Sequence, residues 1–241
     1  MALKRGKRLN ASRGTRIGAA LLSSLALFVA FASSAAAINE FSVGVRSSDG
    51  ADLVGLRGNQ GIRTNPGTVN GVVYVHPTQM DVGSVGASFV AVGTANGAGV
   101  DNCANDYDPH WTGYYDGEIA GIYFCFDFGQ DNWTTGDAPS FRIERDCQLG
   151  PNVRWGLYFA GSQRACIDSG ASGASRAIAG IEVGSDNGTD RNVDAKYTSL
   201  DRRWSGGSWV AFDNTSSIVN SNYSFTRVSS TAVNTFLAPL D

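Results

Sequence analysis

The sequence contains very little lysine or histidine. Only one of its three lysines, Lys196, lies beyond residue 37, and its two histidines are His76 and His110. Serine and cysteine hydrolases usually need a histidine base, and no GxSxG motif is present, so a hydrolase of that type is not expected. No CxxC pair occurs either, which argues against a cysteine and histidine zinc site.

Helical periodicity is also almost absent beyond the first 37 residues. Short alternating apolar runs are instead separated by Gly, Asn and Ser, a pattern typical of an all-β protein. The predicted strands are 41–46, 71–76, 87–92, 119–128, 140–146, 154–161, 163–168, 177–183, 196–200, 207–212 and 223–228. The Gly- and Asn-rich segment 47–70 is predicted to be a loop with weak strands at the domain edge. About a dozen short strands predict a two-sheet antiparallel sandwich.

The first 37 residues have the features of a secretory signal peptide. Six basic residues precede an uncharged apolar run at 17–32, and three alanines at 35–37 provide a small-residue cleavage site. The apolar run is short for a bilayer span. We therefore predict a cleaved leader at 1–37, a single β-sandwich domain at 38–241, and a protein that does not span the membrane. Its expected location is extracellular, either free or associated with the cell envelope.

Removal of this leader makes the protein strongly acidic. Six of the 19 Lys and Arg residues lie in the leader and none of the 22 Asp and Glu residues do, so 13 basic groups face 22 acidic groups and the net charge is −9. An acidic surface repels phosphate backbones, so nucleic acid is not an expected partner. Many secreted proteins carry such a charge without any special partner.

Four cysteines occur, all beyond the predicted leader: Cys103, Cys125, Cys147 and Cys166. An even count in an exported protein indicates two disulfides, for which three pairings are possible. Proximity along the chain favours Cys103–Cys125 and Cys147–Cys166, although spacing alone leaves the other pairings open.

Three loops rich in Asp and Asn are candidate calcium ligands, at 101–108, 127–137 and 185–194. Oxygen ligands of this kind suit Ca²⁺, but none of the loops matches the EF-hand pattern. Asp and Asn also serve turns without any metal. The expectation is therefore no cofactor, with calcium as an alternative.

Glu182 is the first candidate catalytic residue. Strand alternation places Ile178, Gly180 and Glu182 on one face, while the opposite face looks core-facing: Ala177, Ala179, Ile181 and Val183. Glu182 would then lie on the open face of its sheet, next to a glycine that leaves room for a substrate. The alternative is an ordinary exposed strand residue.

A carboxylate-dependent hydrolase needs a second group beside the first. Glu118, at the start of the run 118–128, is the candidate partner, and Glu144 and Asp127 are further acids. Glu144 lies between Arg142 and Asp146, where an ordinary ion pair with an arginine is the simpler expectation.

Aromatic side chains in polar surroundings are candidate ligand-binding residues. Trp111, Tyr114 and Tyr115 lie close to Asp116, and aromatic faces beside carboxylates form platforms for sugars. Trp and Tyr also cover the ends of β-sandwich cores, so a purely structural role is the alternative.

Several segments together resemble secreted actinobacterial proteins related to the neprosin and glutamic-peptidase β-sandwiches. The resemblance covers roughly residues 85–212 and rests on these segments in order: GASFVAVG, a Tyr-rich stretch, YFCFDFG, WGLYFAGSQRACIDSG, AGIEV and YTSLDRRWSGGSW. It implies a two-sheet, concanavalin-like jelly-roll sandwich. In the active peptidases an acid pair, or a Gln and a Glu, lies on the concave sheet.

Of those catalytic positions, the resemblance places only the strand glutamate, at Glu182. The other position is expected near GASFVAVGTANG, where neither Glu nor Gln occurs. The nearest such residues are Gln79 before it and Glu118 well after it. This departure favours a non-catalytic relative.

Three functions are therefore predicted, in order. The first is a non-catalytic secreted domain that binds a glycan, a protein or a cell-surface component. The second is a glutamic-peptidase-like hydrolase that uses Glu182 and a second carboxylate. The third is a structural component of the envelope or the extracellular space.

Overall fold

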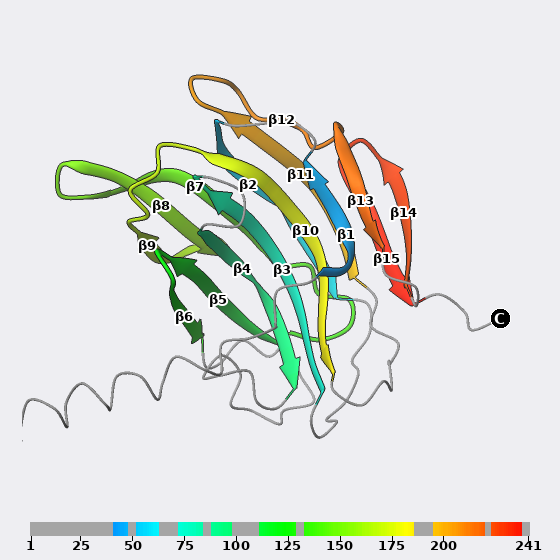
Figure 1. The fold of residues 1–241 in the computed structure, drawn as a ribbon. Helices are drawn as coiled ribbons and strands as arrows, with labels where there is room; N and C mark the ends of the chain where they lie inside the picture. Colours follow the sequence, from blue (N-terminus) through cyan, green and yellow to red (C-terminus); the bar gives the residue numbers. More distant parts are fainter. Residues whose placement is uncertain are drawn as a thin grey trace, which may run out of the picture. The chain divides into compact units, whose positions relative to one another are not determined.

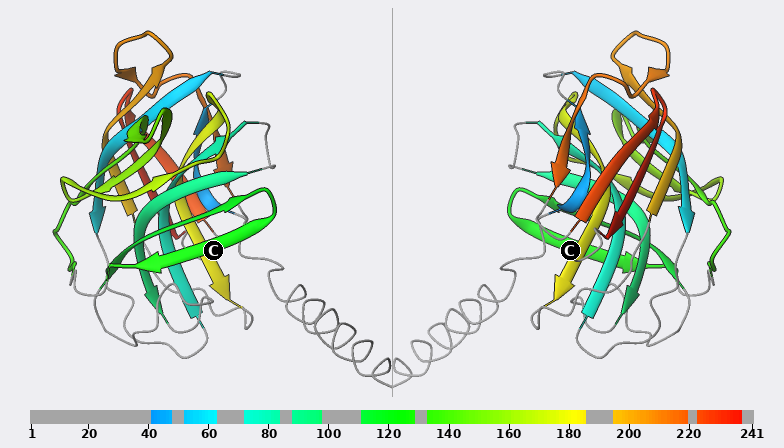
Figure 2. Two further views of the ribbon diagram at one scale, coloured as in Figure 1. Left: turned by 90° about the vertical axis from the view of Figure 1, so that its left-hand side faces the viewer. Right: turned by 90° about the vertical axis from the view of Figure 1, so that its right-hand side faces the viewer.

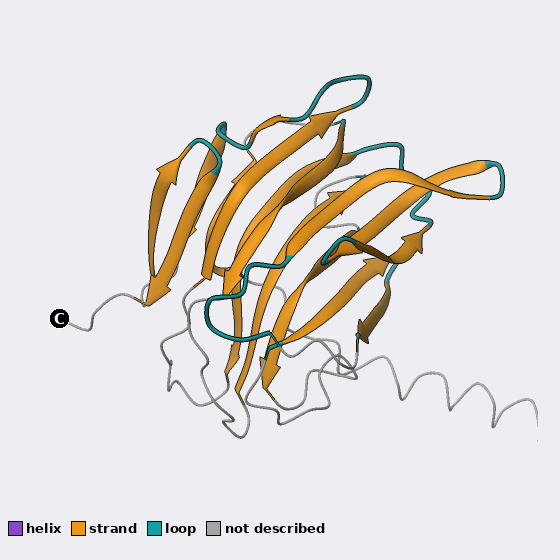
Figure 3. Ribbon diagram, turned by 180° about the vertical axis from the view of Figure 1, so that it is seen from behind, coloured by secondary structure: helices purple, strands orange, loops and turns teal. Residues whose placement is uncertain are grey.

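The structure is a computed structural model that describes residues 41–47, 52–62, 72–83, 88–97, 111–128, 133–185, 195–219 and 223–237. These residues form fifteen strands and no helix (Figure 3). All of them belong to one compact unit, residues 38–241. The strands are long, curved and twisted (Figure 2).

Seven strands form one antiparallel sheet, called here the β10 sheet (Figure 1). In spatial order they are β13 (Thr215–Val219), β1 (Phe41–Ser47), β10 (Ala174–Ser185), β3 (Val72–Val82), β4 (Phe89–Gly97), β5 (Thr112–Ile119) and β6 (Ile122–Asp127).

Seven further strands form the second antiparallel sheet, called here the β2 sheet. Their order is β14 (Tyr223–Ser229), β15 (Ala232–Leu237), β11 (Ala195–Trp204), β2 (Leu53–Ile62), β7 (Ser140–Leu149), β8 (Asn152–Phe159) and β9 (Ser162–Ile167). The short strand β12 (Val210–Ala211) pairs with β11.

The two sheets are joined where Ala174 of β10 pairs with Leu53 of β2. Between them lies one core of buried apolar side chains that includes Trp155, Leu157 and Phe159. The predicted two-sheet antiparallel sandwich is therefore confirmed. The finer description as a concanavalin-like jelly roll stays a prediction.

Strand alternation selects the side chains that fill this core. Ala177, Ala179 and Ile181 of β10 are buried in it, as the alternation predicted. In β7, Phe141 and Ile143 belong to the core while Arg142 lies on the other face. Apolar side chains at every second position fill the core. The residue types on the outer face of each sheet are therefore not determined by core packing.

Polar side chains also connect the two sheets inside the core. The buried hydroxyl of Tyr197, on β11, donates a 2.6 Å hydrogen bond to the carbonyl oxygen of Gly180 on β10. Gln60, on β2, donates a 2.5 Å hydrogen bond from Nε2 to the hydroxyl of Thr94 on β4. These bonds help to fix how the sheets stack, because a buried polar group is costly unless it is paired.

Two sequence-based expectations about strands are wrong. The segment 47–70 was expected to be an edge loop with weak strands, but residues 53–62 form β2, a central strand paired with both β7 and β11. Its buried positions include Gly58 and Gln60, which disguise the apolar alternation. The predicted strand 119–128 is interrupted by a turn at Ala120 and Gly121, both at positive φ, between β5 and β6.

One of the two disulfides expected from proximity is confirmed. Cys147 and Cys166 are bonded and join β7 to β9 across the meander. Cys125 is also disulfide-bonded, and its predicted partner Cys103 lies outside the described residues. Within the described ranges of the chain, no helix has the length and hydropathy needed to cross a membrane.

Candidate functional site

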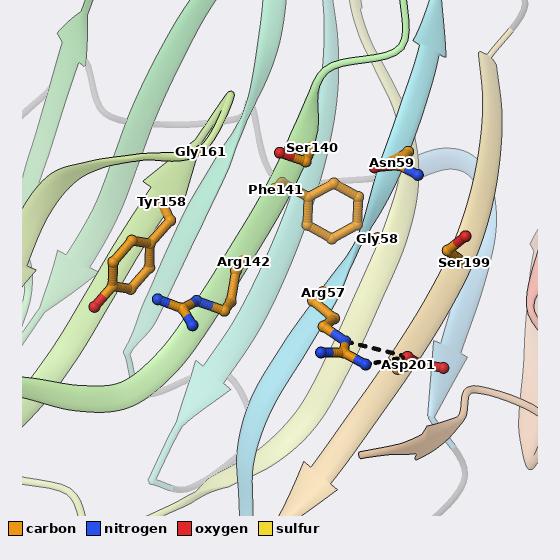
Figure 4. Close-up of a pocket in the computed structure, with 10 residues that line it drawn as sticks. All are labelled: Arg57, Gly58, Asn59, Ser140, Phe141, Arg142, Tyr158, Gly161, Ser199 and Asp201. Carbon is orange, nitrogen blue, oxygen red and sulfur yellow. Dashed lines mark hydrogen bonds and ion pairs between the residues drawn. The ribbon is translucent and has the colours of Figure 1, made fainter.

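A groove with a volume of about 470 Å³ lies on the outer face of the β2 sheet. Four adjacent strands contribute to it, namely β11, β2, β7 and β8 (Figure 4). It is lined by Arg57, Gly58, Asn59, Ser140, Phe141, Arg142, Tyr158, Gly161, Ser199 and Asp201. Volumes of this order are usual for ligand sites.

A break in strand regularity brings the first charged pair together. Asn59 pairs with Thr198 and Arg57 pairs with Asp201, so β11 carries one extra residue between these pairs, in a β-bulge. Ser199, within the bulge, has a φ of 54°. The bulge returns Asp201 to the outer face, where its Oδ2 accepts hydrogen bonds of 3.1 and 2.9 Å from Nε and Nη2 of Arg57.

A second arginine is the cross-strand neighbour of the first, and its guanidinium group turns toward Tyr158 (Figure 4). Arg142 of β7 is the cross-strand partner of Arg57, and it stacks on the ring of Tyr158 at 3.8 Å from the ring centroid. Its Nη1 lies 3.2 Å from Glu144 Oε2, and its Nη2 lies 3.5 Å from Asp146 Oδ2. The Tyr158 hydroxyl donates to Asp146 at 2.9 Å, so this wall of the groove is held by several contacts.

Glu144 anchors the network beneath the groove. It is 4% exposed, and its second oxygen lies 2.6 Å from Nη2 of Arg203, so the ion pair expected for this residue is confirmed. Burial raises the pKa of Glu144, and Arg203 acts in the opposite direction. The ring of Trp209 lies over Gly55. The guanidinium groups of Arg57 and Arg203 both lie over this ring.

The outer face of the β10 sheet has a different character. Asp116 of β5 is half-buried, and its Oδ2 accepts a 3.2 Å hydrogen bond from the hydroxyl of Tyr123, while its buried Oδ1 has no hydrogen-bond partner among the described residues. Burial raises the pKa of Asp116 to about 7, and the Tyr123 hydrogen bond lowers it. Asp81, on β3, is instead paired with Arg176 at 2.6 Å and accepts a 2.7 Å bond from Gln79.

Glu182 lies on β10, paired with Phe41 of β1 and Val75 of β3. The next cross-strand partners in the same row, beyond Val75, are Ala95 of β4 and then Thr112 of β5. None of these four residue types has a carboxyl or amide group. Within the described strands, the cross-strand row of Glu182 therefore supplies no second catalytic group.

Glu118, the predicted partner, lies in another row. It pairs with Phe89, and that row leads through Asp81 to Arg176, six residues before Glu182 on β10. Three strand spacings and six residues along the strand give a Cα separation of roughly 25 Å between Glu118 and Glu182. The structure does not bring these two carboxylates together.

The predicted aromatic platform is mostly buried. Trp111 is fully buried and Tyr114 is 2% exposed. Tyr115 stacks on Phe126 at 5.1 Å between ring centroids and packs against the core. The rings of Trp111 and Tyr114 are therefore closed to a ligand in this structure, that of Tyr115 is half-buried, and the ligand-binding role of the three residues stays a prediction.

Of the three candidate calcium loops, 101–108 lies outside the described residues, 185–194 is described only at Ser185, and 127–137 is described in part. Among the residues that the structure describes, no group of three or more His, Cys, Asp or Glu side chains could hold a metal ion.

The groove residues were not singled out from the sequence. Arg57 and Asn59 belong to the segment that was read as an edge loop, and Asp201 shares their face only because of the bulge at Ser199. The sequence signal for this strand was the alternation of Leu56, Gly58 and Gln60 with polar residues. It was weak because two of the three inward-facing residues, Gly58 and Gln60, are not apolar side chains.

No protein-family model and no curated protein sequence matches this chain. Solved structures do. Scytalido-glutamic peptidase with a transition-state analogue inhibitor matches with a TM-score of 0.55 and 14% identity, over 83% of this chain and 99% of that one. SCP-B, a peptidase of the Eqolisin family in complex with the tripeptide Ala-Ile-His, matches with a TM-score of 0.53 and 12% identity over the same shares.

These matches define the class of fold. The protein has a β-sandwich similar to that of the glutamic peptidases, and the resemblance predicted from the sequence is confirmed at that level. At 12 to 14% identity the similarity concerns the fold alone.

Proposed function

We propose that this protein is a secreted, non-catalytic binding protein whose ligand occupies the groove on the outer face of the β2 sheet. The observation that carries the proposal is the groove itself, about 470 Å³ in volume and lined by polar side chains from four adjacent strands. Several of these side chains are already held in position, since Arg57 is bound to Asp201 and Arg142 to Tyr158. Preorganised polar groups on a rigid sheet lower the entropic cost of binding.

The chemistry of the groove favours binding over catalysis. Among the lining residues the one carboxylate, Asp201, is engaged by Arg57, and the hydroxyl groups of Ser140 and Ser199 have no histidine beside them. The Tyr158 hydroxyl donates to Asp146, a carboxylate that is also paired with Arg142. A general acid and base, or a nucleophile with its base, needs two such groups within hydrogen-bond reach.

A substitution that fills the groove tests this proposal. Ser140 is exposed on β7, so Ser140→Trp should occupy the groove without removing any of its ion pairs. We expect the wild-type protein to be retarded in native gels that contain a polysaccharide ligand and the variant to migrate freely. Ser205→Trp, at an exposed turn away from the groove, is the matched control. Equal retardation of all three proteins would place the ligand elsewhere.

The second candidate function is a glutamic-type peptidase that uses Glu182. It is supported by the fold similarity to structures that hold a transition-state analogue inhibitor or a tripeptide. The row of Glu182 through Val75, Ala95 and Thr112 argues against it, because it offers no second carboxyl or amide group.

Digestion of a denatured protein between pH 3 and 7 separates the two functions. Our proposal expects no cleavage by the folded wild-type protein. Cleavage that Glu182→Gln abolishes and Glu118→Gln preserves would establish the peptidase instead, since register separates these two residues by roughly 25 Å. A purely structural component of the envelope is expected to show neither cleavage nor saturable binding.

A further inference from the structure

The most unusual feature of the groove is the juxtaposition of two arginines. Arg57 and Arg142 are direct cross-strand partners on one face, a pairing that is unfavourable for like charges. Their side chains are 44% and 38% exposed, whereas those of their acidic partners are more buried, at 22% for Asp201, 5% for Glu144 and 30% for Asp146. The positive groups therefore face solvent, and the carboxylates that hold them lie lower in the network.

Hydrogen-bonding capacity remains available on Arg57, on the side that faces Arg142. Arg57 directs Nε and Nη2 to the same oxygen of Asp201, so its Nη1 keeps its donors free of protein partners among the described residues. Figure 4 shows this third nitrogen on the side of Arg142, away from Asp201. An oxyanion placed there would accept hydrogen bonds from Arg57 and would share its face of the sheet with the positive charge of Arg142. Charge-assisted bonds of this kind are the strong ones.

The remaining lining favours a sugar chain as the carrier of that anion. Asn59, Ser140 and Ser199 offer amide and hydroxyl groups at one end, and the ring of Tyr158 lies at the other. The strands beneath are central ones whose backbone groups are already paired, so a peptide cannot add to them as another strand. Hydroxyl-rich ligands, in contrast, need only the side chains that are present.

From this juxtaposition we infer that the groove binds an acidic polysaccharide and holds one uronic-acid carboxylate between Arg57 and Arg142. The inference rests on the proposed binding function and adds the ligand class. Because the rest of the protein is acidic, the electrostatic attraction of an acidic polymer depends on these two arginines. Binding should therefore weaken as salt is added.

Polygalacturonate, its methyl ester, a neutral dextran and dextran sulfate separate the chemical classes in calorimetric titrations of the wild-type protein. We expect binding to polygalacturonate and a loss of at least about tenfold on esterification, since the ester removes the charge that the arginines recognise. Equal affinity for the free acid and its ester or dextran would overturn the inference and leave the binding function intact. Equal affinity for dextran sulfate and polygalacturonate would contradict carboxylate recognition and indicate general polyanion binding. No binding to any of the polymers would contradict both the proposed binding function and the proposed ligand class.

Three variants locate the carboxylate. Arg57→Gln and Arg142→Gln should each weaken binding about tenfold or more, and Asn59→Asp should do the same by adding a negative charge with almost no change in shape. Arg154→Gln is the matched control, because Arg154 forms a comparable ion pair with Asp168 outside the groove. Thermal unfolding of each variant checks that it is folded, and Asn59→Asp keeps the test decisive if an arginine variant is not. A control that loses as much affinity as Arg57→Gln would contradict the proposed site.

Discussion

The two outer faces of the sandwich differ more than the two sheets that carry them. The face of the β10 sheet contains close backbone contacts, with Gly44 opposite Gly180 and Pro77 opposite Gly93. The face of the β2 sheet has its glycines covered by aromatic rings, with Trp209 over Gly55 and Tyr158 over Gly156. Both sheets share one core, so the difference shows that the outward-facing positions are free to diverge while the alternation that fills the core is kept.

Two acids, one in each sheet, also differ in how they are paired. Glu144, in the β2 sheet, lies between Arg142 and Arg203, whereas Asp116, in the β10 sheet, has the hydroxyl of Tyr123 and no cation among its hydrogen-bond partners in the described residues. A carboxylate without a cation is poorly stabilised when it is buried. The β10 face is therefore the one whose stability should respond most to pH.

The largest expected effect is the pH dependence caused by Asp116. Its pKa is about 7 in the folded protein and about 4 in an unfolded chain, so the folded state binds the extra proton between these values and its stability falls as pH rises through that window. Relative to Asp116→Asn, the wild-type protein should lose at most about 4 kcal/mol between pH 4 and 8. Urea unfolding of both proteins across this range measures the difference. Parallel curves would show that Asp116 is ionised in the folded state without cost.

A matched pair of glycine substitutions compares the two faces directly. A Cβ on Gly44 would lie 2.6 Å from the backbone oxygen of Ala179, whereas one on Gly55 would lie 2.6 Å from the Trp209 ring, which can move. We expect Gly44→Ala to cost about 2 to 3 kcal/mol of unfolding free energy and Gly55→Ala about 1 kcal/mol or less. Chemical denaturation measures both values, and a reversed order would show that Trp209 is fixed more firmly than the β1–β10 backbone.

The smallest effect is expected for the ion pair at the groove. Because Arg57 is 44% exposed, its coupling to Asp201 in a double-mutant cycle of unfolding free energies should be below about 1 kcal/mol. A small coupling here, combined with a large loss of ligand affinity, would assign the pair to binding rather than to stability. A coupling of several kcal/mol would mean instead that Arg57 mainly holds β2 to β11.

Local alternation was sufficient to predict much of the fold. Ala177, Ala179 and Ile181 were correctly placed in the core, because strand alternation has a period of two residues and can be read from neighbouring positions. Strand β2 was missed because Gly58 and Gln60 occupy buried positions, where Gln60 donates its amide hydrogen bond to Thr94 of the other sheet.

By itself, then, the sequence determined the all-β class, the alternation that makes the core, and the proximity that joins Cys147 to Cys166. Only the tertiary structure decided which outward-facing residues meet. Arg57 and Arg142 are 85 positions apart and Asp201 is a further 59 away, and they share one groove through strand order, register and a bulge at Ser199. The physical reason is that burial follows a pattern in neighbouring residues, whereas the pairing and register of strands depend on contacts between residues far apart in the sequence.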